Sequence, residues 1–158
     1  MTNLSPILHI VRGVSGSGKT TLAKSLQYAV GCYYFEADMW FVRVDGEYTF
    51  NPAMLPKAHE WCFEQVKREI DLGYSVIVSN TFTRLWEMRN YIEYAKARDY
   101  RIHIITCTGR YPNTHGLTQE MVDKQIARFE SNESIADAYR DSVAAGIMTL
   151  TEYNEYVI

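Results

Sequence analysis

The stretch GVSGSGKT, from Gly13 to Thr20, decides the fold class of this chain. It fits the phosphate-binding pattern G-x-x-x-x-G-K-[ST], whose fixed positions are Gly13, Gly18, Lys19 and Thr20. A loop that wraps a phosphate must turn successive N–H groups inward, and glycine permits this because it tolerates a positive φ. The motif therefore predicts a nucleotide site with the binding residues Gly13, Ser15, Gly16, Ser17, Gly18, Lys19, Thr20 and Thr21.

Two side chains of the motif have expected chemical roles. Lys19 is predicted to place positive charge against the β- and γ-phosphates and to act in catalysis. Thr20 is predicted to offer its hydroxyl to Mg²⁺ and is the predicted metal-contacting residue. The predicted cofactors are thus ATP, or another nucleoside triphosphate, and Mg²⁺.

Strand and helix patterns alternate around the loop. Short β-rich runs predict strands at Ile7–Arg12, Cys32–Glu36, Ser75–Ser79 and Arg101–Cys107. Apolar residues at three- and four-residue steps predict helices over residues 21–30, 55–70 and 85–95. Such alternation favours an α/β fold with a parallel sheet of about four to five strands, covered on both faces, with ligands at the carboxyl ends of the strands.

The C-terminal third departs from this alternation. A turn-rich loop, TGRYPNTHG, precedes a helical pattern from Leu117 to Ser131 that Thr118 is suited to cap. This piece, about residues 109–131, is the expected helical lid. The tail from Ser134 to Ala145 is helix-compatible and ends at Gly146, whereas the last twelve residues are compatible with a fifth strand or a short helix.

Length and composition limit the class of protein. With 158 residues, 47% of them hydrophobic and 22% charged, the chain is expected to form a single domain over residues 1–158. No apolar stretch approaches the roughly 20 residues of a membrane span, and no charge precedes Arg12, so we expect a cytoplasmic protein without a membrane segment. The cysteines are interpreted as free buried thiols rather than as a zinc site or a disulfide: Cys32, Cys62 and Cys107.

Charge is distributed unevenly, although the net charge is only −3. Residues 84–110 contain six basic and three acidic side chains, whereas residues 130–158 contain six acidic ones and Arg140 alone as a basic one. The net charge argues against nucleic-acid binding through a global field. The segment 84–110 is compatible either with solvated helix faces or with a basic wall for an anionic substrate.

Asp38 is the first candidate for the residue that faces the γ-phosphate. It follows the second predicted strand, 19 residues after Lys19, and this strand is expected to end beside the phosphate loop. A carboxylate there can accept the proton of a hydroxyl in line with the γ-phosphate, so Asp38 is predicted to be a catalytic base. Two alternatives stay open: Asp38 caps a helix that begins at Met39, or Glu36 is the base.

At the end of the strand SVIVS, where an acidic residue is usual, this chain has the neutral residues Ser79, Asn80 and Thr81. Ser79 or Asn80 is expected to orient a metal-bound water, with Asp38 or Glu36 sharing the metal.

Phosphoryl transfer also needs positive charge over the transferred group. Arg110 and Arg128, which flank the expected lid, are candidates for that charge, with plain surface arginines as the alternative. His59 and His115 stay open between a structural role and contact with a substrate.

These residues together resemble a known family. The pattern covers roughly residues 7–131 and is similar to the P-loop kinases grouped around phage polynucleotide 5′-hydroxyl kinase, and to AAA-type P-loop kinase domains. The segments that carry the resemblance are GVSGSGKT, EADMWF, the G-x-Y-x-F of Gly46 to Phe50, AHEWC at Ala58 to Cys62, VIVSNTFT, and N-x-H-G at Asn113 to Gly116.

The resemblance implies roles for individual residues. It makes Asp38 the general base, lets Lys19 and Thr20 match the lysine and hydroxyl of the family's loop, and makes Arg128 a catalytic lid arginine that contacts the phosphates. The chain departs from the phage enzyme at Phe41 and Asn80, where that enzyme has an arginine and an aspartate. Both departures weaken the expectation of a polynucleotide substrate.

We therefore expect a three-layer P-loop kinase fold and transfer of the γ-phosphoryl group of ATP to a hydroxyl-bearing acceptor. The family and the basic segment favour a nucleic-acid end, a nucleoside or a modified base as acceptor. A small polar metabolite fits the acidic net charge. A module that binds ATP, or hydrolyses it slowly without a kinase acceptor, is a third alternative because Asn80 replaces an acidic residue. Neither the acceptor nor the oligomeric state follows from these patterns.

Overall fold

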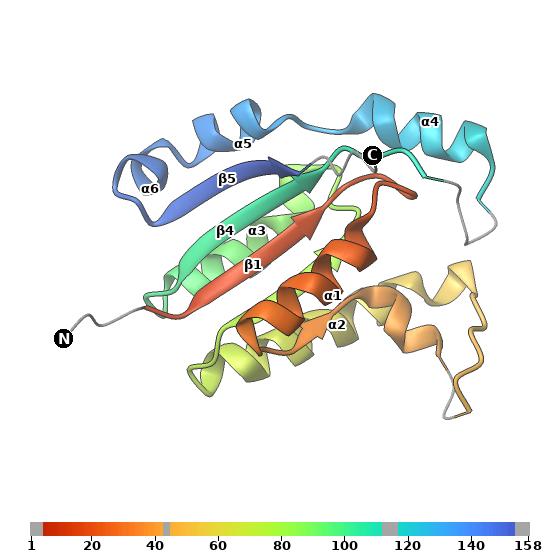
Figure 1. The fold of residues 1–158 in the computed structure, drawn as a ribbon, viewed down its shortest axis with the longest axis horizontal. Coiled ribbons are helices and arrows are strands. Elements are labelled where there is room, and N and C mark those ends of the chain that lie inside the picture. Colours follow the sequence, from red (N-terminus) through yellow and green to blue (C-terminus); the bar gives the residue numbers. More distant parts are fainter. Residues whose placement is uncertain (1–4, 43–44, 112–116, 154–158) are drawn as a thin grey trace.

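A parallel sheet runs through the middle of the molecule (Figure 1). The structure, a computed structural model, describes residues 5–42, 45–111 and 117–153. Within these residues, five strands lie in the order β2-β3-β1-β4-β5, all parallel to their neighbours. They are β1 (Ile7–Arg12), β2 (Tyr34–Phe35), β3 (Val76–Asn80), β4 (Arg101–Cys107) and β5 (Met148–Tyr153).

Helices cover both faces of the sheet. Figure 1 shows α1 in front of the sheet and α3 behind it, with α4, α5 and α6 along the side of β5. This arrangement confirms the expected three-layer α/β fold with a parallel sheet. The helices are α1 (Lys19–Val30), α2 (Leu55–Asp71), α3 (Leu85–Lys96), α4 (Gln119–Arg128), α5 (Asn132–Ala138) and α6 (Arg140–Ala144), with short 3-10 helices η1 (Ala37–Phe41) and η2 (Pro52–Met54).

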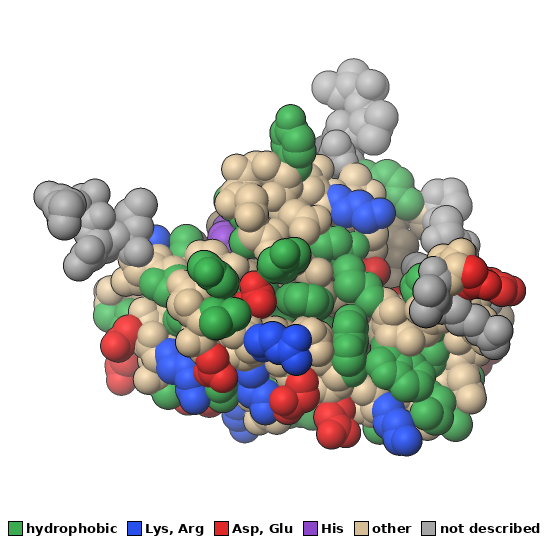
Figure 2. Space-filling view, turned by 90° about the horizontal axis from the view of Figure 1, so that it is seen from below, with side chains coloured by type: hydrophobic (Ala, Val, Ile, Leu, Met, Phe, Trp, Pro, Cys, Tyr) green, Lys and Arg blue, Asp and Glu red, His purple; other side chains and the backbone are tan. Residues whose placement is uncertain are grey.

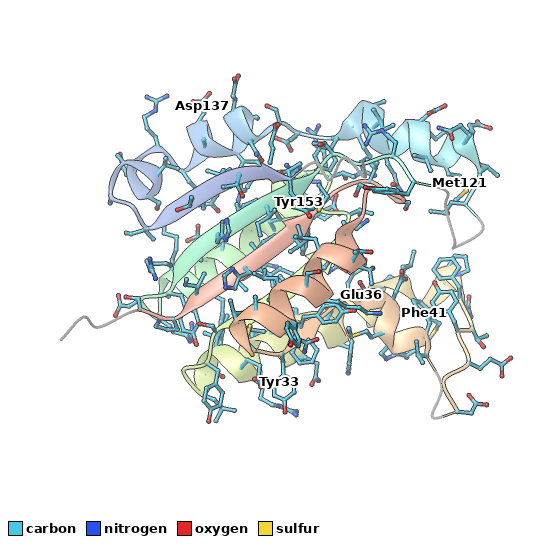
Figure 3. All side chains as sticks on the ribbon, viewed as in Figure 1. Tyr33, Glu36, Phe41, Met121, Asp137 and Tyr153 are labelled. Atoms are coloured by element: carbon cyan, nitrogen blue, oxygen red, sulfur yellow. The ribbon has the colours of Figure 1, made fainter. Side chains whose placement is uncertain are left out.

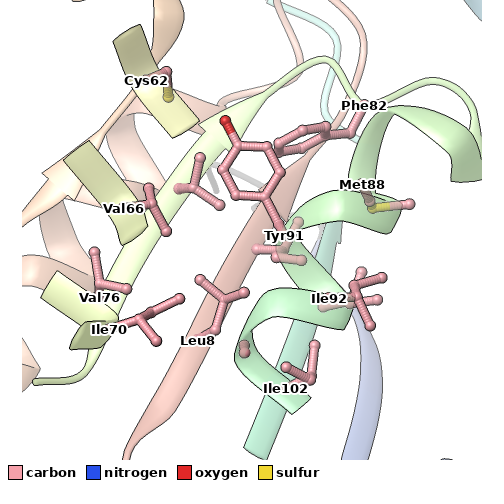
Figure 4. Packing of buried hydrophobic residues seen from close by; sticks show 14 of the residues in the cluster. Leu8, Cys62, Val66, Ile70, Val76, Phe82, Met88, Tyr91, Ile92 and Ile102 are labelled. Atoms are coloured by element: carbon pink, nitrogen blue, oxygen red, sulfur yellow. The ribbon is translucent and has the colours of Figure 1, made fainter. Parts of the chain in front are cut away.

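The core lies on both sides of the sheet, because the strands are buried on both faces as parallel strands usually are. Figure 4 shows side chains from β1, α2 and α3 meeting in the larger cluster, among them Leu8, Val66 and Ile92. A smaller cluster packs α1 against the opposite face. The cysteines are free, as expected: Cys62 and Cys107 are buried and Cys32 is partly buried.

β2 is shorter than the predicted strand and is not adjacent to β1. The chain leaves the sheet after Phe35 because it turns into η1, whose Ala37 N–H donates to Asn80 Oδ1 at 2.9 Å. β3 lies between β2 and β1, so the residues after β2 reach the phosphate loop across the end of β3. Asp38 lies inside η1, which has no side-chain cap, so the alternative that Asp38 caps a helix is wrong.

The C-terminal region settles two open points. The last part of the chain contains a fifth strand, β5, which pairs with β4 from Met148 to Tyr153. The predicted tail helix is divided at Tyr139, whose φ of −121° and ψ of 37° separate α5 from α6. Thr118 caps α4 as expected, because its Oγ1 accepts from the Met121 N–H at 3.2 Å.

The helices of the described residues contain none that is both long and apolar enough to cross a membrane.

The buried His9, which lies beside the partly buried His103, predicts acid sensitivity of the fold. His9 is only 6% exposed, and its Nδ1 lies 3.4 Å from Nδ1 of His103. Burial, aided by His103 and Arg101, lowers the pKa of His9 from 6.5 to about 4. Between these values the unfolded chain binds a proton that the folded chain does not, so stability is complete above pH 6.5 and falls toward pH 4.

The expected loss from His9 over this window is about 3 kcal/mol of unfolding free energy. Urea unfolding at a series of pH values measures it, and His9→Gln is expected to flatten the slope because glutamine does not titrate. An unchanged slope in this variant would assign the acid sensitivity to other groups.

Candidate active site

The phosphate-binding loop joins the end of β1 to the start of α1. Gly16 and Gly18 have φ values of 80° and 95°, a region that glycine adopts without strain. A Cβ at Gly13 would collide with Ser17 Oγ and lie 2.9 Å from the carbonyl oxygen of Cys107. The glycines are therefore required by the close turn of the backbone and by the neighbouring end of β4.

A cavity of about 670 Å³ opens at the carboxyl end of the sheet, beside this loop. Figure 3 shows Glu36, Phe41 and Met121 at this same end of the molecule, away from Asp137. Of the predicted nucleotide-binding residues, the cavity is lined by Ser15, Gly16, Gly18, Lys19, Thr20 and Thr21. Gly13 and Ser17 lie buried within the loop itself.

Glu36 lies next to the predicted metal-contacting residue. Thr20 Oγ1 donates to Glu36 Oε2 at 3.3 Å, and both residues line the cavity. A carboxylate beside the hydroxyl of the loop fits a Mg²⁺ ion, which prefers oxygen ligands and usually keeps several waters and phosphate oxygens. The position of Glu36 therefore fits the expected sharing of the metal.

The end of β3 supplies one polar atom without a protein partner. Ser79 Oγ is buried, lines the cavity and has no hydrogen-bond partner among the described residues. Asn80, by contrast, accepts from Ala37 N and donates to Cys62 Sγ at 3.7 Å. Of the two candidates for orienting a metal-bound water, Ser79 is therefore available and Asn80 has a structural role.

Asp38, which belongs to η1, also lines the cavity. The Tyr48 hydroxyl donates to Asp38 Oδ1 at 3.3 Å. Burial and the neighbouring Asp38 raise the pKa of Tyr48 to about 12, so this hydroxyl keeps its proton at neutral pH. His59 also lines the cavity; it is exposed at the surface, although burial of its imidazole in the site lowers its pKa.

Lys19 is folded back onto its own loop. Its Nζ donates to the carbonyl oxygen of Val14 at 3.1 Å. Burial lowers the pKa of Lys19, while Cys107, Glu36 and Asp38 oppose that shift. Both carboxylates of the site therefore act electrostatically on the Lys19 ammonium group.

The region of the expected lid contacts the phosphate loop at two points. Tyr111 N donates to Gly16 O at 2.7 Å, and Ser15 N donates to Gln125 Oε1 of α4 at 2.8 Å. Met121 and Gln125 line the cavity from one face of α4, because they are four residues apart, and Leu117 lines it from the segment before this helix.

The two candidate lid arginines do not line the described part of the cavity. Arg128 Nη2 lies 3.6 Å from Glu87 Oε1, and Arg110 donates to the carbonyl oxygens of Thr108 and Gly109. Arg128 thus pairs with a carboxylate of α3, and its contact with phosphate stays a prediction. His115 lies outside the described residues.

The basic segment 84–110 does not form a wall of the cavity in the described structure. Arg84 pairs with Glu130 at 3.1 Å, and Arg98 pairs with Asp71 at 3.3 Å and lies over the ring of Tyr94. Figure 2 shows basic and acidic side chains interspersed on the face that it presents, without a continuous basic patch. These observations favour solvated helix faces over a basic wall.

Comparison with protein families assigns the chain. A family model described as AAA domain matches residues 8–142, which include the phosphate loop, Asp38 and α4. The chain belongs to this AAA domain family. The expected relationship to P-loop kinase-like domains is thereby confirmed.

Two curated relatives differ greatly in length. This AAA domain is 26% identical to NEDD4-binding protein 2 of Homo sapiens over 87% of the chain, but it spans only 8% of that protein. It is 28% identical to a gluconokinase of Gluconobacter oxydans (strain 621H), with 80% of the chain and 77% of that enzyme covered.

Solved structures share the fold at low sequence identity. The AvrRxo1-ORF1:-ORF2 complex with ATP has a TM-score of 0.67 at 15% identity, covering 98% of this AAA domain and 56% of that chain. Kti12 of Chaetomium thermophilum in complex with ADP-AlF3 has a TM-score of 0.66 at 13% identity, covering 93% and 88%. The Pnkp1/Rnl/Hen1 complex has a TM-score of 0.56 at 18% identity, covering 78% and 40%.

Sequence reasoning missed the contacts of two site residues in this AAA domain. Tyr48 belongs to the G-x-Y-x-F segment, but its hydrogen bond to Asp38 depends on the turn between η1 and η2. Gln125 carries no local signal, because its partner Ser15 lies 110 residues earlier in the chain.

Proposed function

We propose that the protein is an ATP-dependent kinase that transfers the γ-phosphoryl group to a hydroxyl of an acceptor. The observation that carries this proposal is one cavity lined by both the phosphate-binding Lys19 and Thr20 and the candidate base Asp38. A P-loop supplies the phosphate site, and a carboxylate at the other wall supplies what a hydroxyl nucleophile needs. Membership in a P-loop kinase-like family supports the same reaction class.

In the proposed reaction, Asp38 accepts the proton of the acceptor hydroxyl as its oxygen forms a bond to the γ-phosphorus. The bond from that phosphorus to the β–γ bridging oxygen breaks, and its electron pair leaves with ADP. Lys19 offsets the negative charge of the phosphates, and the loop N–H groups hold them in place. The Tyr48 hydroxyl holds one oxygen of Asp38 and so helps to orient the base.

Thr20 and Glu36 are the residues that we propose to hold Mg²⁺, with Ser79 Oγ available to a metal-bound water. When bound, the ion supplies positive charge to the phosphate oxygens. The described residues contain no group of three or more His, Cys, Asp and Glu side chains placed to hold a metal on their own. This fits an ion that arrives with the nucleotide and keeps water and phosphate ligands.

The acceptor half of the cavity has an aromatic wall. The rings of Tyr48 and Phe50 are nearly parallel, at 8°, with centroids 6.4 Å apart, and both residues line the cavity. Pro52 and Leu55 extend this surface toward His59. Aromatic faces favour acceptors with a planar ring, because base–aromatic stacking contributes about 1–3 kcal/mol per base. We therefore propose a nucleoside, a modified base or a nucleic-acid end as acceptor.

A small polar metabolite is the second candidate acceptor. It is supported by the similarity to a gluconokinase that covers most of both chains. The pairing of Arg84 and Arg98 with carboxylates also removes two residues that a polyanion could have used. A third alternative, an ATP-binding or ATP-hydrolysing module without an acceptor, remains tied to Asn80 in place of an acidic residue.

Transfer of labelled γ-phosphate tests the proposal. The protein is incubated with γ-labelled ATP and Mg²⁺ and, separately, with oligonucleotides bearing a free 5′-hydroxyl, nucleosides, and small polyols or sugar acids. Label in an acceptor, with ATP turnover that rises with acceptor concentration, supports a kinase and identifies the class. Turnover that no acceptor changes would contradict the kinase and favour the hydrolysing module.

Lys19→Ala is expected to weaken ATP binding by about 10- to 100-fold, since a charge-assisted contact to phosphate is lost. The fold is expected to persist because the ammonium group donates to its own loop and Lys19 belongs to neither hydrophobic cluster. Titration calorimetry measures the affinity, and circular dichroism checks the fold. Lys24→Ala is the matched control, as this lysine is exposed on the same helix. If Lys19→Ala bound ATP with the affinity of the parent, the assignment of the nucleotide site to this loop would be wrong.

A further inference from the structure

One donor of the phosphate loop is already engaged by a distant side chain. Ser15 N donates to Gln125 Oε1 at 2.8 Å, and the two residues are 110 positions apart in sequence. Ser15 stands at the third position of the motif, in the part of the loop whose N–H groups face the phosphate site. The amide oxygen of Gln125 therefore accepts from a group that is suited to an anionic oxygen.

The hydrogen bond from Ser15 N to Gln125 Oε1 competes with phosphate for the same donor. A single N–H group makes one strong hydrogen bond, so Gln125 Oε1 and a phosphate oxygen exclude each other at Ser15. The phosphate oxygen is the stronger acceptor because it is charged. Gln125 lines the same cavity as Lys19 and Thr20, so an entering phosphate chain meets it directly.

The helix that carries Gln125, α4, is held near its C-terminus. Beyond the C-terminus of α4, the Glu130 N–H donates to Thr83 O at 2.8 Å, and the Glu130 carbonyl accepts from Arg12 at 2.8 Å. Arg84 donates to the carbonyl oxygen of Arg128 at 3.2 Å. The bond to Ser15 is a further attachment, made by the middle of the helix to the phosphate loop.

We propose that Gln125 is a phosphate-competing latch. Its side-chain oxygen holds the Ser15 N–H while the loop is free of phosphate, and a bound triphosphate takes over this donor and releases α4 from the loop. The helix then keeps its anchor at Glu130 and loses its contact to the motif, so the wall of the cavity that Met121 and Gln125 form depends on nucleotide binding. The inference rests on the proposed binding of ATP at this loop.

Two substitutions at Gln125 give opposite expected effects. Gln125→Leu keeps a similar volume and removes the competing acceptor, so ATP is expected to bind about three- to tenfold more tightly. Gln125→Glu places a carboxylate on the same N–H and near the phosphates, so ATP is expected to bind at least about tenfold more weakly. Titration calorimetry on the whole chain measures both.

Controls separate the latch from general changes of α4. Gln119 is the matched position, because it lies on the same helix and its Nε2 donates to Asp123 Oδ1 at 2.9 Å on an exposed surface. Gln119→Leu and Gln119→Glu are expected to bind ATP like the parent. Inorganic tripolyphosphate is expected to give the same order of affinities as ATP at Gln125, because the latch concerns the phosphate chain and not the base.

The outcomes are distinguishable. Weaker binding in Gln125→Leu would make this residue a phosphate ligand and overturn the latch, and so would parent-like binding in both Gln125 variants. If the parent binds neither ATP nor tripolyphosphate, the proposed function and the latch both fail. If the parent binds them but transfers no phosphate, the latch is still decided by the two variants while the kinase proposal fails.

Thermal unfolding gives a second measure that does not require an affinity. Added ATP is expected to raise the unfolding temperature more in Gln125→Leu than in the parent, and less in Gln125→Glu, because stabilisation by a ligand follows its affinity. Equal shifts in all three proteins would contradict the latch.

Discussion

Asp38→Asn is expected to lower the rate of phosphoryl transfer by about 10²- to 10⁴-fold, because the substitution keeps the shape of the side chain and removes the proton acceptor. ATP binding is expected to change little, since Asp38 is proposed to face the acceptor and the Thr20 hydroxyl donates to Glu36 rather than to Asp38. Single-turnover transfer of labelled phosphate and titration calorimetry measure the two effects separately.

Two further variants separate the role of Asp38 from the roles of its neighbours. Tyr48→Phe removes the hydrogen bond to Asp38 Oδ1 and keeps the ring, so it is expected to lower transfer much less than Asp38→Asn. Glu36→Gln is expected to raise the Mg²⁺ concentration needed for half-maximal transfer. A loss of ATP affinity in Asp38→Asn as large as its loss of transfer would make Asp38 a metal ligand rather than the base.

Arg12→Leu is expected to lower the free energy of unfolding by about 3 to 5 kcal/mol. Arg12 is fully buried, and its guanidinium donates to the carbonyl oxygens of Phe82 at 3.0 Å, Thr83 at 3.3 Å and Glu130 at 2.8 Å. It also lies 4.0 Å from the ring centroid of Phe129. Leucine fills part of the volume but leaves these buried acceptors without a donor.

Denaturant unfolding followed by circular dichroism measures this effect. Burial lowers the pKa of Arg12 to about 10, which still leaves the guanidinium charged at neutral pH. Arg12→Lys is expected to be intermediate, because an ammonium group cannot reach all of the carbonyls at once. Arg140→Leu, at an exposed position, is the control and is expected to change stability little. A loss in Arg12→Leu no larger than in this control would show that water replaces the guanidinium.

The parts of the fold that the sequence predicted are those that depend on residues close together in the chain. The loop from Gly13 to Thr20 has a fixed spacing, and its glycines adopt the backbone angles that the motif requires. Thr118 was recognised as a cap because the preference for a hydroxyl before a helix is a property of the neighbouring residues. The position of β2 at the edge was not predictable in this way, since strand order is set by packing across the sheet.

The residues of the candidate site also differ in how far local patterns predict them. Lys19, Thr20 and Asp38 could be identified because each follows a strand or belongs to the motif, and parallel strands bring such residues to one edge. The direction of Arg128 could not, because Glu87 of another helix decides it. The structural role of Asn80 was not predictable either, because its amide oxygen accepts from the Ala37 N–H, 43 positions earlier, and so fixes the turn that presents Asp38.

The contacts of Arg12 have a consequence for how related sequences would vary. Three of its acceptors are main-chain carbonyls, at Phe82, Thr83 and Glu130, and every amino acid carries such a group. Replacement of those three side chains therefore leaves the acceptors in place, whereas replacement of the arginine removes the donor. In an alignment we expect a constant arginine next to the motif that does not change in step with positions 82, 83 and 130. Methods that detect contacts from paired substitutions would overlook these three contacts.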